Sequence, residues 1–327
     1  MKRMLMTAMA LLTLSACAQA ENRVKYQNPV LNINFPDPFV LKTDEGYYAY
    51  ATNGNGKDIQ MAFSKDLVNW DVKGDALGGL PFWAQGGLTW APEVIQNGEK
   101  YLMYYTLRDT ASNYQCISVA VSDSPAGPFK DDSQKPLICQ ADEGGSIDAS
   151  PFRDKDGQLY LYWKNDGNAI GLLTYIYGQK LSADGLSLLE EPVQLLYNRE
   201  LWEGNLIEAP TMYEKDGYYY LLFSASDFAS DLYAVGYAVG KSPLGEFKKF
   251  EDNPIVYTVG DVAGPGHQTI TFDDAGNPWL VYHAWTAGAI GDDVGKRTMR
   301  IDPIEFKDGK VIFKEPTLTE QEGPVIK

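Results

Sequence analysis

The chain has 327 residues, 44% of them hydrophobic, which is enough for one large domain or two ordinary ones with a sizeable core. Its 28 basic and 44 acidic residues give a net charge of −16, which excludes the basic surface of a nucleic-acid binder. An acidic surface suits a neutral substrate. The 21 Tyr, 13 Phe and 7 Trp favour strands over helices and offer flat rings on which sugars stack.

The N-terminus predicts an export signal over residues 1–20, followed by a single domain over 21–327. A basic pair precedes an apolar run over 4–14 that is too short to span a bilayer. The letters LSAC resemble a bacterial lipobox, which would make Cys17 the lipidated residue, while an ordinary cleavage site before Glu21 competes with it. We expect an exported protein, either periplasmic, held at the outer membrane by a lipid, or secreted, with no other membrane contact.

Five similar segments follow one another with a period near 57 residues. Each opens with a polar residue, runs into a strand, turns at an acidic or glycine-containing hairpin signal, and returns as an aromatic-rich strand. The spacings between the opening residues are 56, 55, 60 and 59 residues. In chain order these opening residues are Asp37, Glu93, Asp148, Glu208 and His267.

Third and fourth strands follow in several repeats. Four antiparallel strands in each of five units predict an all-β fold, a five-bladed β-propeller around a central channel. Because the first strand of each blade lines the channel, we expect the five opening residues to converge at one mouth. A strand near residues 26–31 should close the ring against the last blade, which ends around 304–313.

Carboxylates gathered in one pocket raise the pKa of at least one of them through burial and mutual repulsion. Glycosidic cleavage needs this, because one carboxylic acid protonates the leaving oxygen while a carboxylate activates water or attacks carbon. Taken singly, Asp37 and Asp148 are also typical of turn residues that cap backbone amides. Glu208 is a poorer turn former, and an acid between Ile207 and Ala209 favours a tuned site.

The chain resembles glycoside hydrolase family 43, whose members are five-bladed propellers acting on arabinan, arabinoxylan and xylan. The motifs PDPFV, WAPEV, SIDASPFRDKDG, EAPTMY and GPGHQT carry the resemblance over residues 28–306. It implies that Asp37 is the general base, that Glu208 is the general acid, and that Asp148 orients Glu208 and favours its protonated form. Cleavage would invert the anomeric carbon, with acid and base about 6.5–9.5 Å apart.

The resemblance also implies a set of substrate contacts. Trp90 would stack on the sugar, with packing between blades as the alternative. Arg297 would reach the substrate, with Arg300 as the alternative residue for that position. The resemblance places a water or a calcium ion beside His267, although calcium takes six to eight oxygen ligands and a buried, hydrogen-bonded His is the alternative. The chemistry itself requires no cofactor. The expected contacts are Phe39, Trp90, Glu93, Asn165, Asp166, His267 and Arg297.

The sequence leaves several alternatives open. We expect a monomeric, exo-acting α-L-arabinofuranosidase first, then a β-xylosidase or an endo-α-1,5-L-arabinanase, and last a non-catalytic carbohydrate-binding propeller. The retaining fructan hydrolases are disfavoured because Arg153-Asp154 is followed by Lys155 and not by proline. In an oxidising compartment Cys116 and Cys139 form either a disulfide or two buried thiols.

Overall fold

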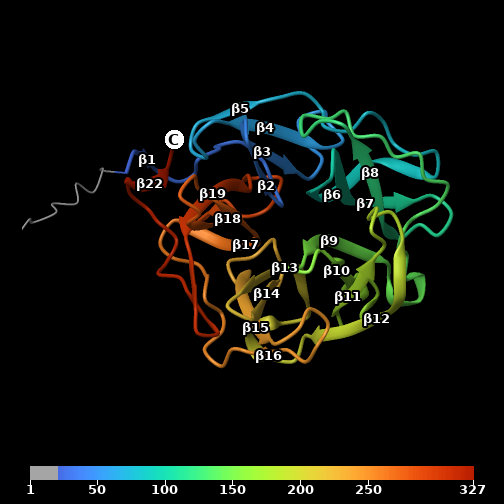
Figure 1. Ribbon diagram of the computed structural model, residues 1–327. Helices are drawn as coiled ribbons and strands as arrows, with labels where there is room; N and C mark the ends of the chain where they lie inside the picture. Colours follow the sequence, from blue (N-terminus) through green and yellow to red (C-terminus); the bar gives the residue numbers. More distant parts are fainter. Residues whose placement is uncertain (1–20) are drawn as a thin grey trace, which may run out of the picture.

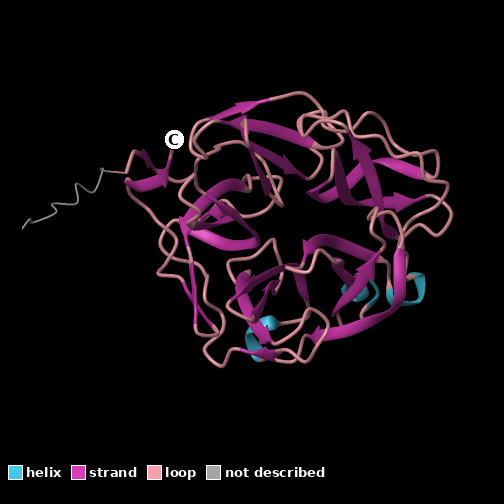
Figure 2. Cartoon of the chain, in the orientation of Figure 1, coloured by secondary structure: helices cyan, strands magenta, loops and turns pink. Residues whose placement is uncertain are grey.

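The structure is a computed structural model that describes residues 21–327, so the expected export signal and Cys17 lie outside the described residues. It is an all-β five-bladed propeller, which confirms the predicted fold (Figures 1 and 2). No helix among the described residues reaches the length and hydropathy of a membrane span. The helical segments are three short 3₁₀ turns, η1 (Ala141–Glu143), η2 (Gly167–Ile170) and η3 (Leu201–Glu203).

Three blades contain four antiparallel strands in sequential order. Blade 1 consists of β2 (Phe39–Thr43), β3 (Gly46–Ala51), β4 (Gln60–Ser64) and β5 (Trp70–Val72). Blade 3 consists of β9 (Ser146–Arg153), β10 (Leu159–Asn165), β11 (Tyr175–Leu181) and β12 (Leu188–Tyr197). Blade 4 consists of β13 (Ile207–Lys215), β14 (Tyr218–Ala225), β15 (Ala234–Gly240) and β16 (Lys248–Lys249).

The other two blades have three regular strands each. Blade 2 consists of β6 (Ala84–Asn97), β7 (Lys100–Asp109) and β8 (Gln115–Ser122). Its outer edge is covered by isolated bridges from Lys130 and Ile138 to β8. Blade 5 consists of β17 (Val262–Phe272), β18 (Pro278–Thr286) and β19 (Thr298–Pro303).

The N-terminal part of the described chain closes the ring. Leu31 exchanges two backbone hydrogen bonds with Met299 of β19, at 3.3 and 3.2 Å, and so covers the edge of blade 5. Outside the blades, two small two-stranded sheets complete the fold. They pair β1 (Arg23–Tyr26) with β22 (Gln321–Val325), and β20 (Glu305–Lys307) with β21 (Lys310–Ile312).

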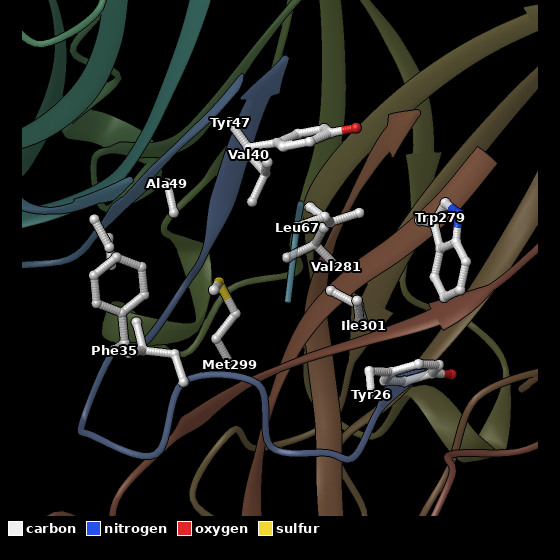
Figure 3. Close-up of a cluster of buried hydrophobic side chains, with 13 residues drawn as sticks. Tyr26, Phe35, Val40, Tyr47, Ala49, Leu67, Trp279, Val281, Met299 and Ile301 are labelled. Atoms are coloured by element: carbon white, nitrogen blue, oxygen red, sulfur yellow. The ribbon is translucent and has the colours of Figure 1, made fainter. Parts of the chain in front are cut away.

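The hydrophobic core is divided into five clusters, one between each pair of neighbouring blades. Every blade is buried on both faces, which explains why its second strand reads as a nearly continuous apolar and aromatic run. Figure 3 shows the cluster between blades 1 and 5, where Val40 and Tyr47 meet Val281 and Met299. This packing joins the two ends of the ring.

Cys116 of β8 and Cys139, which precedes β9, are joined by a disulfide, with their Cα atoms 4.6 Å apart. The bond ties the edge of blade 2 to the segment that enters blade 3. A cross-link over a loop of this length stabilises by about 3 kcal/mol, chiefly through the unfolded chain. We therefore expect the Cys116→Ala/Cys139→Ala variant to lose about 3 kcal/mol of unfolding free energy in urea. Wild-type protein in reductant should lose a similar amount, and an unchanged midpoint in both would contradict the prediction.

Candidate active site

One backbone feature recurs in or just before the inner strand of each blade. Five non-glycine residues have a left-handed φ of 45–58°, a conformation that is costly for a residue with a Cβ. Their spacings are 54, 57, 61 and 58 residues, so they mark the equivalent positions of the five blades. These residues are Asp37, Ala91, Asp148, Ala209 and His267.

The register expected from the sequence is therefore off in two blades. Glu208 lies one residue before its blade's equivalent position, and Glu93 lies two residues after it. Two residues advance a strand by about 6.6 Å, so Glu93 is set further along the channel than the other opening residues. The sequence prediction aligned the blades by their polar residues. Ala91 and Ala209 are not polar, so the sequence does not reveal that they hold the equivalent backbone positions of blades 2 and 4.

Neighbouring blades are tied together at these positions. The N–H groups of Ala91 and Asp148 donate to the hydroxyls of Thr52 and Thr106, at 2.9 and 3.3 Å. The N–H of His267 donates to Ser224 Oγ at 2.8 Å, and that of Asp37 to His283 Nδ1 at 3.0 Å. In each case the acceptor belongs to the second strand of the preceding blade or directly follows it.

Blade 4 departs from this pattern. The register places Lys164 of β10 where the other blades have their acceptor, and an ammonium group accepts no hydrogen bond. The Ala209 N–H instead donates to Asp148 Oδ2 at 2.9 Å. Asp148 therefore anchors the backbone directly beside Glu208, which gives it a positioning role.

A pocket of about 450 Å³ opens at this mouth of the channel. It gathers seven of the ten residues that the sequence analysis selected. Asn165 is not among its lining residues, because its side chain is bound to the backbone of Leu173 and Tyr175 at 3.1 and 2.6 Å. Phe39 and Glu93 line a separate pocket of about 390 Å³, which corrects their expected place in the site. The seven are Asp37, Trp90, Asp148, Asp166, Glu208, His267 and Arg297.

Asp37 is buried beside an arginine, two histidines and a threonine. Arg297 Nη1 lies 3.1 Å from its Oδ1, and the Nδ1 atoms of His267 and His283 both lie 3.3 Å from it. Thr52 accepts the Ala91 N–H, so its own hydroxyl proton is directed to Asp37 Oδ2. Burial alone would raise the pKa of Asp37, but the charges of Arg297 and His267 outweigh it and hold the pKa well below its usual range. Asp37 is therefore ionised at neutral pH.

His283 of β18 supports Asp37 from below the pocket floor. Burial lowers the pKa of His283 to about 4, so the ring is neutral at neutral pH and its Nδ1 accepts the Asp37 N–H. The proton then resides on Nε2. On its face, the ring of Tyr233 stacks at a centroid distance of 5.8 Å and an interplanar angle of 10°.

Both carboxylate oxygens of Glu208 have donors. The Tyr233 hydroxyl donates to Oε1 at 2.7 Å, and Lys164 Nζ donates to Oε2 at 3.2 Å. Burial and the Glu208 charge raise the pKa of Tyr233 well above its ordinary value, so the phenol stays a donor. Gly266 allows this placement, since a Cβ there would lie 2.1 Å from the Tyr233 ring. Tyr233 thus connects Glu208 to the histidine that supports Asp37.

Asp148 lines the same pocket as Asp37 and Glu208, and its pKa is shifted in the opposite direction from that of Asp37. Burial raises the pKa of Asp148 to about 6, and the Glu208 charge acts in the same direction, against the opposing effect of His267 and Lys164. Asp37 and Asp148 are therefore driven apart in pKa by their surroundings, a separation typical of acid–base sites.

Lys164 is a fully buried ammonium. It donates to Asn168 Oδ1 at 2.7 Å and lies 3.6 Å from Asp166 Oδ1, besides its contact with Glu208. Burial would lower the pKa of Lys164, but the charges of Glu208, Asp166 and Asp148 outweigh it and raise the pKa. The residue escaped the sequence analysis, although a lone lysine in the apolar strand LYLYWKN is a signal that finds it.

Removing this ammonium should be costly. Lys164→Met leaves two partly buried carboxylates without their cation, and breaking a buried pair costs about 3–5 kcal/mol of unfolding free energy. Denaturant unfolding of the purified variant measures this. Lys100→Met is the matched control, because Lys100 pairs with Asp123 in solvent and should leave stability unchanged. Equal effects of the two substitutions would contradict a structural ion pair at Lys164.

Glu93 lies deep in the channel, where Ser150 Oγ donates to its Oε2 at 2.8 Å. Burial raises the pKa of Glu93 to about 8, assisted by the charge of Asp148 and opposed by the Ser150 hydrogen bond. Between its ordinary pKa of 4.5 and about 8, the folded protein binds this proton more tightly than the unfolded chain does. Its contribution to stability therefore falls as the pH rises through that window.

Glu93→Gln should remove this pH dependence. Glutamine keeps the shape and can accept the Ser150 hydrogen bond, so the variant should match wild type at pH 4. Between pH 5 and pH 8, the unfolding free energy of the variant should rise relative to that of wild type by up to about 1.4 kcal/mol per pH unit. Urea unfolding at pH 4, 6, 8 and 9 measures the difference. Parallel pH profiles of the two proteins would show that Glu93 ionises freely.

The pocket does not fit a calcium ion held by protein ligands. Within residues 21–327, no three or more His, Cys, Asp or Glu side chains are arranged to hold a metal ion. His267 supplies one nitrogen, and its Nδ1 faces Asp37. Calcium prefers six to eight oxygens.

The arrangement of fold and site defines a class of protein. A propeller whose channel mouth holds an ionised carboxylate and a second, hydrogen-bonded carboxyl group in one pocket has the parts of a glycoside hydrolase. Residues 26–311 match the sequence profile described as "Glycosyl hydrolases family 43". The chain belongs to this family.

Similar proteins agree with this assignment. The "Beta-D-galactofuranosidase xynD" of Aspergillus niger is 27% identical over 330 residues, covering 94% of this chain and 90% of that protein. The "Extracellular endo-alpha-(1->5)-L-arabinanase 1" of Bacillus subtilis is 28% identical over 84% of this chain and 85% of its own. The crystal structure of a thermostable family-43 glycoside hydrolase superposes with a TM-score of 0.83 at 36% identity, covering 91% of this chain and 99% of that one.

Proposed function

We propose that the protein is an inverting, exo-acting glycoside hydrolase that releases pentoses from arabinan, arabinoxylan or xylan, with α-L-arabinofuranosidase as the first activity. One observation carries the proposal: a single pocket holds Asp37, ionised by Arg297, and Glu208, held by Tyr233 and Lys164. β-Xylosidase and endo-α-1,5-L-arabinanase are the alternatives, and the non-catalytic sugar-binding propeller would not need this pair.

In the proposed mechanism, Asp37 removes a proton from water as the water oxygen bonds to the anomeric carbon. The bond from that carbon to the leaving oxygen breaks on the opposite face, and Glu208 gives its proton to the leaving oxygen. The hydroxyl of Tyr233 and the ammonium of Lys164 then stabilise the carboxylate that Glu208 becomes. The single displacement inverts the anomeric configuration.

Loops support exo action on a terminal sugar. The pocket is walled by η2 and by segments around Asn205, Asp227 and Asp292, which belong to three different blades or their connections. A pocket closed on several sides accommodates the end of a chain more readily than its middle. None of residues 71–89 lines the pocket, although the following residue, Trp90, does.

Partner and location follow as parts of the proposal. The substrate is a neutral oligosaccharide or polysaccharide, which agrees with the acidic net charge of −16. The protein acts outside the cytoplasm, which the N-terminal signal pattern and the extracellular relative from Bacillus subtilis support, and we propose that it acts as a monomer. A lipid at Cys17 is its proposed membrane attachment.

Hydrolysis of nitrophenyl α-L-arabinofuranoside, β-D-xyloside and β-D-galactofuranoside tests the activity, the last being included because of the Aspergillus niger relative. We expect the arabinofuranoside to be cleaved fastest, with the first-formed sugar inverted when followed by NMR. A product of retained configuration would overturn the mechanism. Sugar binding without any hydrolysis would favour the non-catalytic propeller.

A further inference from the structure

A second cavity lies next to the active site, on the side of the general acid. It has a volume of about 400 Å³ and is here called the blade-4 groove. Its walls come from η3, from the loop between β14 and β15, and from the segment that leads into β17. The residues on which the argument rests are Leu201, Trp202, Asp231, Leu232, Tyr257 and Thr258.

The groove and the active-site pocket open on the same face. Strands alternate in direction, so loops that enter a blade's first strand and loops that leave its second strand lie at the same end of the propeller. Two chain segments wall both cavities. Gly204 lines the groove while Asn205 lines the pocket, and Ser226 lines the groove while Asp227 lines the pocket. The cavities are therefore immediate neighbours.

Contacts between neighbouring segments hold the walls of the groove in place. The ring of Trp202 packs against that of Phe223 in a tilted pair, with centroids 5.7 Å apart, and it lies against Gly236, where a Cβ would come within 2.7 Å of the indole. Thr258 Oγ1 donates to the Asp231 carbonyl at 2.5 Å and accepts the Gly264 N–H at 3.0 Å, which joins two of the walls. A preformed groove binds without the cost of ordering its loops.

Its surface is apolar and acidic together. Leu201 is fully exposed, Leu232 is 69% exposed and Tyr257 is 52% exposed. Asp231 beside them, with Asp227 on the shared wall, disfavours a nucleic acid or an anionic membrane. Exposed apolar side chains interleaved with carboxylate and hydroxyl groups suit a neutral, amphipathic ligand such as a sugar ring.

The position of Glu208 decides which part of a substrate would occupy the groove. A general acid lies on the leaving-group side of the scissile bond. Glu208 belongs to blade 4, and its partner Tyr233 directly follows Leu232 of the groove. We propose that the blade-4 groove is a distal leaving-group subsite, which binds a sugar unit of the same chain beyond the bond that is cut. This inference rests on the proposed function.

The test compares short and long substrates in a variant with the groove residues changed. Leu201→Ser/Tyr257→Ser alters two exposed side chains, and Leu189→Ser, exposed on β12 outside the groove, is the matched control. For wild type, kcat/KM should rise from the disaccharide to the tetrasaccharide of α-1,5-linked arabinose. In the variant this rise in kcat/KM should be about tenfold smaller, because KM for the tetrasaccharide increases while kcat does not change. A tenfold change corresponds to a loss of about 1.4 kcal/mol of binding free energy. Nitrophenyl arabinofuranoside should be cleaved equally by all three proteins.

Several results would overturn the subsite. One is a wild-type kcat/KM that does not depend on the chain length of the substrate. Another is an equal loss of kcat/KM by the variant on nitrophenyl and oligomeric substrates. A third is a concentration-dependent dimer of the wild type that the variant does not form. If wild type cleaves no glycoside, the proposed function fails separately. Calorimetric titration of arabinotetraose and xylotetraose into wild type and variant then tests sugar binding in the groove independently of catalysis. Equal affinities of the wild type and the variant for both sugars would reject the subsite.

Discussion

Asp37→Asn is expected to lower kcat by about 10²–10⁴-fold on every glycoside, whatever its leaving group. Asparagine keeps the shape and an acceptor oxygen for Arg297, but its amide nitrogen cannot accept the Thr52 hydroxyl proton and it takes no proton from water. The pKa of Asp37 lies well below its usual range, so wild type has the ionised base at any pH near neutrality. Steady-state kinetics on nitrophenyl and oligomeric substrates measure the loss.

The control for Asp37 is a remote carboxylate. Asp142→Asn changes an exposed residue of η1 and should keep wild-type turnover. Circular dichroism and urea unfolding establish that Asp37→Asn is folded. A folded Asp37→Asn protein with near-wild-type turnover on all substrates would remove Asp37 from the role of base.

Glu208→Gln should show a loss that depends on the leaving group. Without a proton donor, cleavage of oligosaccharides, whose leaving oxygen is strongly basic, should fall by about 10²–10⁴-fold. Aryl glycosides with acidic phenols depart without protonation and should lose far less. A series of aryl glycosides with graded phenol pKa gives the slope of log kcat against that pKa, which should steepen in the variant.

A comparison of Glu208→Gln with Asp37→Asn separates the two roles. Only the acid variant should recover on substrates with good leaving groups, since the attack of water needs its base in every case. If Glu208→Gln lost the same factor across the series, Glu208 would not be the acid. Tyr233→Phe should reproduce a weaker form of the same leaving-group dependence, because it removes one donor from Glu208.

Some features of this protein follow from the order of its residues. Hairpin signals at a period near 57 residues required five equivalent antiparallel units, and units that bury both faces close into a propeller. The same period places Asp37, Asp148 and Glu208 near the start of the inner strands of blades 1, 3 and 4. Local turn chemistry and strand alternation act between residues close in the chain, so they can be read from the sequence.

The details of the site depend on residues that are far apart in the chain. The disulfide was left open by the sequence, since pairing depends on the distance between two Cα atoms. Glu93 was expected in the pocket, but the left-handed backbone at Ala91 shifts it along the channel. Lys164 and Tyr233 bind Glu208 across 44 and 25 residues of chain. No short-range pattern encodes such pairs.

The propeller and its carboxylates at the channel mouth were thus determined by the sequence alone, because a repeated local pattern needs only its own period to place them. Tertiary structure decided their roles. The ionised state of Asp37 depends on Arg297 of the last blade, 260 residues away. The hydrogen bonds to Glu208 come from Lys164 and Tyr233, which belong to two different blades. The electrostatic environment of a site is set by distances in space, and only the closed ring brings these groups within hydrogen-bonding distance.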